Sequence, residues 1–119
     1  MLICDDEAPL RALVRATLEG DNYEIVEAAD GEEALDLARR LRPDVILLDT
    51  MMPGRSGLDV LGELGADPAL ASIPVVMLTA RVQQCDREAA ALLGAARFLA
   101  KPFSPRQLEK LVRELVAGA

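Results

Sequence analysis

Short runs of Val, Ile and Leu alternate along the chain with segments whose apolar residues recur every three or four positions. The runs are bounded by turn residues, which is typical of strands buried on both faces of a parallel sheet. Five such alternations predict a doubly wound α/β fold. The predicted strands are residues 2–4, 23–28, 45–48, 73–78 and 98–100.

The segments after these runs have the apolar spacing of helices. Asp30-Gly31 is expected to begin the second helix, and Ser104 as N-cap with Pro105 as first residue to begin the last. A helix over residues 82–93 is the least defined, because its alanines blur the apolar stripe. The other helices are expected to face the core with Leu10, Leu13, Val14 and Leu18; Ala34, Leu37, Ala38 and Leu41; Val60, Leu61 and Leu64; and Leu108, Leu111, Val112, Leu115 and Val116.

Four of the apolar runs stop at a reactive side chain. Asp5 and Asp6 follow the first run, and Asp49 follows the third. Thr79 follows the fourth and Lys101 the fifth. Because ligands bind outside the carboxyl ends of the strands in an open α/β sheet, we expect these side chains to converge on one small site.

Composition limits the classes of function. The 119 residues suffice for a core without disulfide or metal, and we expect a single domain over residues 1–119. The net charge of −7 argues against bulk attraction to nucleic acid or to an anionic membrane. No apolar run is long enough to span a membrane and no signal peptide opens the chain, so a cytoplasmic location is expected.

The chain contains no histidine, and its two cysteines, Cys4 and Cys85, are far apart. This composition excludes Ser-His-Asp and Cys-His catalysis, zinc sites with histidine ligands, and phosphohistidine chemistry on this chain. The expected site therefore works with carboxylates, a threonine and a lysine.

Three carboxylates at one point repel one another, and a divalent cation relieves this repulsion. Hard oxygen ligands favour Mg²⁺, with Mn²⁺ as a substitute. Two chemistries fit such a site: a carboxylate that accepts a phosphoryl group, or a metal-activated water that hydrolyses a bound substrate. Taken alone, Asp5-Asp6 could N-cap the following helix, and Asp49, Thr79 and Lys101 could be ordinary residues beside turns. Their coincidence at four strand ends favours a functional site.

The residues at the strand ends occur in motifs that resemble those of response regulator receiver domains, in the chemotaxis-regulator-like superfamily of two-component systems. The motifs are Asp5-Asp6-Glu7, Asp49-Thr50-Met51-Met52-Pro53 with Gly57, Thr79-Ala80 and Lys101-Pro102-Phe103. In this order and spacing they are highly specific, and the resemblance runs essentially from end to end. It implies a flavodoxin-like three-layer sandwich with a five-stranded parallel sheet in the order 2-1-3-4-5 and five flanking helices.

The resemblance also implies a role for each site residue. Asp49 would accept a phosphoryl group from the histidine of a sensor kinase or a histidine phosphotransfer protein. Asp5, Asp6, Asp49 and the backbone carbonyl of Met51 would hold Mg²⁺. Lys101 would pair with the phosphate.

Two further residues are implied to transmit the signal. The hydroxyl of Thr79 would move toward the phosphoryl group, and Phe98 would turn inward in response. The surface formed by the fourth helix, fifth strand and fifth helix would then shift and control an effector that the sequence does not name. A phosphorylation-dependent homodimer is one outcome in this family, although Arg97 stands where many DNA-binding relatives carry an acid of the dimer interface.

The favoured function is therefore a switch that is not a turnover enzyme and that loses its phosphoryl group slowly. The alternatives are a small Mg²⁺-dependent aspartyl-phosphate hydrolase, a flavin-binding module of the same fold, and a receiver that no longer accepts phosphate. Hydrolases usually carry Asp-x-Asp after the first strand, where this chain has Asp5-Asp6-Glu7. Arg11 and Arg15 on the first helix are candidates for docking the kinase.

Overall fold

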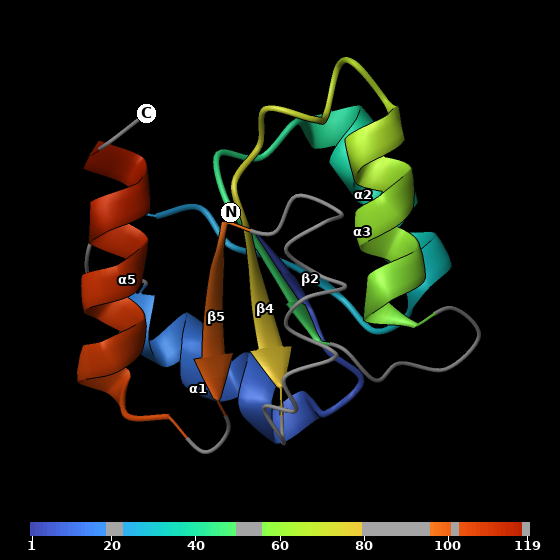
Figure 1. The fold of residues 1–119 in the computed structure, drawn as a ribbon. Helices are drawn as coiled ribbons and strands as arrows, with labels where there is room; N and C mark the ends of the chain where they lie inside the picture. Colours follow the sequence, from blue (N-terminus) through green and yellow to red (C-terminus); the bar gives the residue numbers. More distant parts are fainter. Residues whose placement is uncertain (19–22, 50–55, 80–95, 101–102, 118–119) are drawn as a thin grey trace.

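The computed structural model describes residues 1–18, 23–49, 56–79, 96–100 and 103–117 (Figure 1). In chain order, the elements are β1 (Leu2–Cys4), α1 (Ala8–Leu18), β2 (Val26–Ala28), α2 (Gly31–Leu41), β3 (Ile46–Asp49), α3 (Gly57–Ala66), β4 (Val75–Thr79), β5 (Arg97–Ala100) and α5 (Pro105–Ala117). The helix predicted over residues 82–93 lies outside the described residues.

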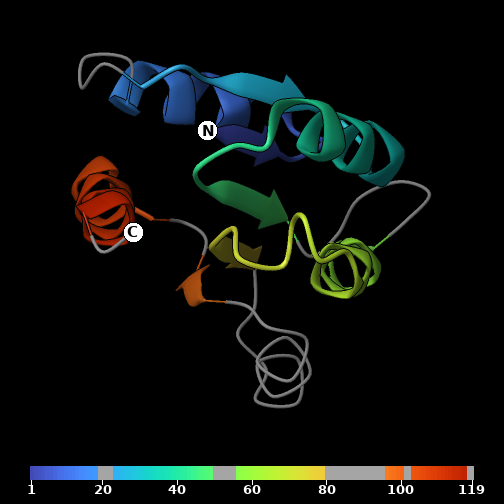
Figure 2. The same cartoon turned by 90° about the horizontal axis from the view of Figure 1, so that it is seen from above.

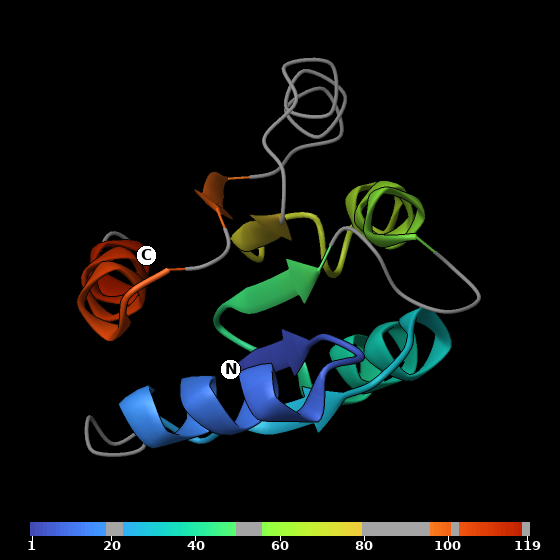
Figure 3. The same ribbon diagram turned by 90° about the horizontal axis from the view of Figure 1, so that it is seen from below.

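The strands form one parallel sheet in the order β2-β1-β3-β4-β5, which confirms the predicted fold class. β3 lies at its centre, because Ile46 pairs with Leu2 of β1 on one side and with Val75 of β4 on the other. All strands therefore end at one edge of the sheet, toward the bottom of Figure 1. Views from above and below show α1 and α5 on one face and α2 and α3 on the other (Figures 2 and 3).

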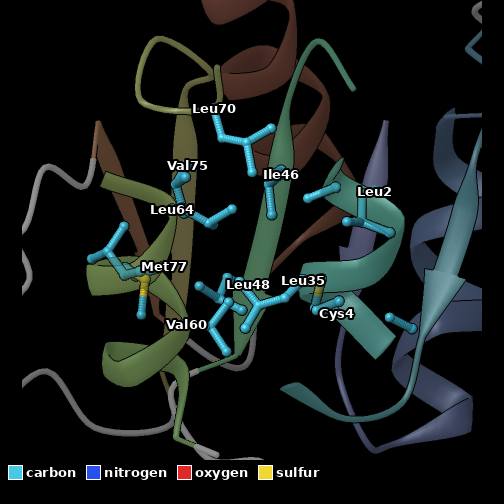
Figure 4. Close-up of a cluster of buried hydrophobic side chains, with 14 residues drawn as sticks. Leu2, Cys4, Leu35, Ile46, Leu48, Val60, Leu64, Leu70, Val75 and Met77 are labelled. Atoms are coloured by element: carbon cyan, nitrogen blue, oxygen red, sulfur yellow. The ribbon is translucent and has the colours of Figure 1, made fainter. Parts of the chain in front are cut away.

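Successive strand residues point to opposite faces and divide the core into two apolar layers. The layer on the side of α2 and α3 includes Cys4, Leu35, Leu48, Leu64 and Met77 (Figure 4). The layer on the side of α1 and α5 includes Ile3, Val14, Leu47, Leu78 and Leu108. This burial on both faces explains the continuous apolar runs, and it anchors the strands whose ends carry the predicted site.

Two strands begin later than predicted. β2 begins at Val26 rather than at residue 23, because β1 has three residues and pairs only with the last three residues of the predicted segment. β4 begins at Val75 rather than at residue 73. The N–H of Ile73 donates to a carbonyl of the preceding turn, and Pro74 has no N–H to offer the sheet.

Three leucines on the helices differ from the predicted stripes. Leu13 and Leu41 are 38% and 51% exposed, whereas Leu35, absent from the predicted stripe, is 2% exposed. α2 contacts β1, β2 and also α3, so its buried face is rotated toward Leu35. The buried residues of α2 are Gly31, Ala34, Leu35 and Ala38.

The helix starts at Asp30 and Ser104 are confirmed. The Asp30 carboxylate accepts a hydrogen bond from the N–H of Glu33 at 2.9 Å. Ser104 and Gln107 form a capping box, in which each side chain accepts a hydrogen bond from the other residue's N–H, at 3.2 and 2.9 Å. In the described part of the chain, no helix has the length and apolar character needed to cross a membrane.

Candidate metal centre at the carboxyl edge of the sheet

Three carboxylates meet where β1 and β3 end. Asp5 and Asp6 directly follow β1, and Asp49 is the last residue of β3. Since Cys4 lies opposite Leu48 in the parallel pair, Asp5 and Asp49 occupy equivalent positions on neighbouring strands. The predicted convergence is thus found for these three residues.

The carboxylate cluster (Asp5, Asp6 and Asp49) has oxygen atoms that all lie within 4.8 Å of one another. Asp5 and Asp49 are 0% and 4% exposed, whereas Asp6 is exposed. The cluster therefore has a buried floor and an open side at Asp6. Hard oxygen donors at this spacing fit a small divalent cation, whose charge offsets their mutual repulsion.

Asp5 is held through both its main chain and its side chain. Its N–H donates to the Ala28 carbonyl at 3.1 Å, and its Oδ1 accepts from the N–H of Glu7 at 2.8 Å. The bond to Glu7 closes a local turn just before α1. The first hydrogen bond of α1 is accepted by the Glu7 carbonyl, so the bond from Glu7 to Asp5 forms a turn before the helix and is not the helix cap considered for Asp5-Asp6.

Arg11 and Arg15 of α1 both bind Glu27 of β2. The Nε of Arg11 donates to Oε1 of Glu27 at 3.1 Å, and Nε and Nη2 of Arg15 donate to Oε2 at 3.0 and 2.8 Å. Nη1 of Arg11 also donates to the Asp5 carbonyl at 2.6 Å. From the sequence, the two arginines are candidates only for docking a kinase. The signal for their contact with Glu27 is an acid within a strand run, preceded by two arginines four positions apart.

Two pKa values near the cluster are displaced. The hydrogen bond from Arg15 lowers the pKa of Glu27, and the bond from Arg11 adds to this effect. Burial raises the pKa of the Cys4 thiol, and the charges of Glu33 and Asp5 raise it further. Cys4 therefore stays protonated beside the cluster, which leaves hard oxygen atoms as the donors.

The remaining predicted site residues are only partly described. Thr79 is the last residue of β4 and pairs with Ala100 of β5, so these strands end at the same edge as β1 and β3. The side chain of Thr79, together with Lys101 and Met51, lies outside the described part of the chain. Phe98 of β5 lies opposite Met77 and packs, partly buried, against the core layer on the side of α2 and α3.

A hollow of about 370 Å³ lies at the opposite edge of the sheet. Met1, Tyr23, Leu41 and Asp44 are among its lining residues. Since these residues precede β1, β2 and β3 or end α2, the hollow lies a strand length away from the carboxylate cluster. It is not part of the candidate site.

Comparison with known proteins agrees with this fold. The family model of the response regulator receiver domain matches residues 1–113. PhoB of Pseudomonas aeruginosa, the phosphate regulon transcriptional regulatory protein, is 40% identical over 91% of this chain and 47% of its own length. MtrA of Mycobacterium leprae, a DNA-binding response regulator, is 39% identical over 95% of this chain and 49% of its own length.

A solved structure matches over almost its whole length. The Vibrio cholerae chemotaxis protein CheY4 is 33% identical, with a TM-score of 0.91 over 96% of this chain and 95% of that chain. The chain spans about half the length of the curated relatives that it matches. The chain belongs to the response regulator receiver domain family of two-component signalling.

Proposed function

We propose that the chain is a phosphorylation switch, in which Asp49 accepts a phosphoryl group from the histidine of a sensor kinase or a histidine phosphotransfer protein. The observation that carries this proposal is the carboxylate cluster, whose oxygen atoms lie within 4.8 Å at the carboxyl edge of a receiver domain sheet. Two of its members are buried, so the cluster is a built feature of the fold and not a chance grouping of surface acids.

The position of Asp49 at the end of the central strand supports the proposed transfer. An Asp49 oxygen attacks the phosphorus of the phosphohistidine, and the new P–O bond forms as the P–N bond breaks. The leaving imidazole keeps the electron pair and takes up a proton from solvent. Asp5, Asp6, Asp49 and the Met51 carbonyl are the groups that would hold Mg²⁺, which, when bound, neutralises charge on the phosphoryl oxygens.

Phosphorylation changes the positions of residues on and near β4, β5 and α5. A phosphoryl group adds about −1.5 to −2 charges and strong acceptor atoms. It attracts the Thr79 hydroxyl and the Lys101 ammonium, and Phe98 moves inward after Thr79. Arg97 of β5 binds Glu114 of α5 at 3.4 Å, which supports transmission from β5 to the surface formed by the fourth helix, β5 and α5.

The wider role follows from the same proposal. The chain works in the cytoplasm, without turnover of a substrate apart from slow loss of its own phosphoryl group. The names of MtrA and PhoB make control of transcription the proposed output, through an effector protein or domain and with homodimerisation as one route.

The test is phosphorylation by a small-molecule donor. The chain is incubated with acetyl phosphate or phosphoramidate and Mg²⁺, and its intact mass is measured. We expect a gain of one phosphoryl group that is lost in Asp49→Asn and kept in Asp59→Asn, a matched change at an exposed acid of α3. No gain, or a gain that survives Asp49→Asn, would overturn the proposal.

The same incubation discriminates the alternatives. Release of inorganic phosphate over many turnovers, without a persistent gain of one phosphoryl group, would favour the hydrolase. Mg²⁺ binding without any phosphoryl gain would favour a receiver that no longer accepts phosphate.

A further inference from the structure

The hydrogen bonds of Arg11 converge on the turn that carries two of the proposed metal ligands. Its main-chain N–H donates to the Glu7 carbonyl at 3.2 Å, and its Nη1 donates to the Asp5 carbonyl at 2.6 Å. The Asp5 carbonyl belongs to the peptide group that joins Asp5 to Asp6. Arg11 therefore fixes the plane of the one peptide that sets the relative orientation of these two carboxylates.

Glu27 in turn fixes the guanidinium group of Arg11. Its Oε1 accepts from Nε of Arg11, while its Oε2 accepts from Arg15. The Arg11 side chain is 17% exposed and that of Arg15 is 38% exposed, so Arg11 is the inner member of the pair. A guanidinium group bound on two sides loses little additional freedom when it orients the Asp5 carbonyl.

We propose that Arg11 is a positioning residue for the divalent cation site, because it orients the peptide between Asp5 and Asp6 while Glu27 holds its guanidinium group. This inference rests on the proposed function, since it assumes that Asp5 and Asp6 bind Mg²⁺. Arg11 does not touch the cation; it acts through the main chain of its ligands.

Arg15 provides the matched control. It shares Glu27 with Arg11, but its Nη2 also donates to the Ile25 carbonyl of the segment before β2, at 3.1 Å. A purely structural connection between α1 and β2 predicts similar effects of Arg11→Gln and Arg15→Gln. A positioning role predicts that only the change at Arg11 weakens Mg²⁺ binding.

The experiment measures the Mg²⁺ dissociation constant by isothermal titration calorimetry, at constant ionic strength and without a phosphoryl donor. The variants are Arg11→Gln, Arg11→Lys and Arg15→Gln, and urea unfolding in EDTA measures their stability. We expect Arg11→Gln to weaken Mg²⁺ binding about tenfold, the effect of one charge-assisted hydrogen bond. Arg15→Gln should stay within about twofold despite a similar loss of stability. Arg11→Lys should recover part of the affinity, because an ammonium group also donates to the carbonyl.

The outcomes separate this inference from the function on which it rests. If the wild type binds Mg²⁺ and is phosphorylated, but Arg11→Gln and Arg15→Gln bind Mg²⁺ equally well, the positioning role is wrong and the switch stands. If Arg11→Lys binds Mg²⁺ as weakly as Arg11→Gln, although both are folded, the positioning role is also wrong. If the wild type itself binds no Mg²⁺, both proposals fail.

Discussion

At the residue scale, the protonation state of Glu27 depends on its two arginine partners. Its carboxylate accepts three hydrogen bonds from two guanidinium groups, and its side chain is 34% exposed. Only the ionised carboxylate accepts all of these charge-assisted bonds. The lowered pKa of Glu27 follows from these contacts, with the bond from Arg15 as the largest cause.

This lowered pKa makes part of the stability pH-dependent. Its usual value is 4.5, so as the pH falls the unfolded chain takes up the proton before the folded chain does. Ionised Glu27 therefore stabilises the fold above about pH 4.5, and this contribution is lost as the pH falls through the folded-state pKa. We expect Glu27→Gln to cost about 1 kcal/mol in the free energy of unfolding at pH 7 and progressively less below pH 4.5.

Urea unfolding of both proteins between pH 7 and pH 3 measures this difference. Glu24→Gln, at an exposed acid just before β2, serves as the control and should change little at any pH. A cost of Glu27→Gln that is the same at pH 7 and pH 3 would contradict the assigned pKa.

Some residues of the candidate site could be predicted from the sequence, and others could not. Asp5, Asp6 and Asp49 follow strands, and the ends of parallel strands meet at one edge whatever the helices do. The bonds of Glu27 depend on how α1 lies across β2, which apolar spacing alone does not determine. The roles of Thr79 and Lys101 stay predictions.

At the element scale, α2 illustrates how packing partners select a helix face. Its sequence offers leucines at 35, 37 and 41, and the predicted stripe uses the last two. In the structure, Leu35 packs in the core layer on the side of α2 and α3, and Leu41 lies at the exposed end of the helix. Contact with α3 as well as the sheet decides between these faces.

Alanine substitutions on α2 test this face. Leu35→Ala removes a side chain that is 2% exposed, and we expect a loss of about 2–5 kcal/mol in the free energy of unfolding. Leu41→Ala removes a side chain that is 51% exposed and should cost about 0.5 kcal/mol or less. Urea denaturation of both variants measures the difference. Equal losses would mean that α2 is rotated from the described orientation.

Cap chemistry proved more predictable than the helix faces. Asp30 and Ser104 begin α2 and α5 as predicted, because an N-cap is decided by one side chain and the N–H groups of the next turn. The choice of the buried stripe depends on partners far away in the sequence. Local signals therefore predicted where helices start, and tertiary contacts determined which side faces inward.

At the scale of the whole molecule, the carboxylate cluster links metal binding to global stability. A ligand that binds only the folded state stabilises it by about 2.7 kcal/mol when its concentration is a hundredfold above the dissociation constant. We therefore expect Mg²⁺ to raise the melting temperature of the wild type, because it relieves repulsion among Asp5, Asp6 and Asp49.

Thermal unfolding in EDTA and in excess Mg²⁺ tests this expectation, with NaCl at matched ionic strength as the control for screening. In EDTA, Asp6→Asn should be at least as stable as the wild type, because one repelling charge is removed. In Mg²⁺, its melting temperature should rise less than that of the wild type. An equal rise in both proteins would show that Asp6 contributes nothing to cation binding.

The fold class, the strand order and the strand bounds were predictable to different extents. Alternating strand and helix patterns predicted a doubly wound sheet, since few other folds bury such short apolar runs on both faces. The strand order was implied by the family resemblance, because apolar spacing does not say which strand lies beside which. β2 began later than predicted, because its partner β1 is only three residues long.

The strand order has a consequence for how the molecule could be altered by evolution or by design. β3, which ends in Asp49, lies between β1, which leads into Asp5 and Asp6, and β4, which ends in Thr79. The two proposed ion ligands beyond β1 are thus separated by one strand from the proposed switch residue at the end of β4. If the proposed roles hold, substitutions beyond β1 would alter ion binding and substitutions beyond β4 would alter the recipient of the signal, while β3, the strand of the proposed phosphoacceptor, stays the same.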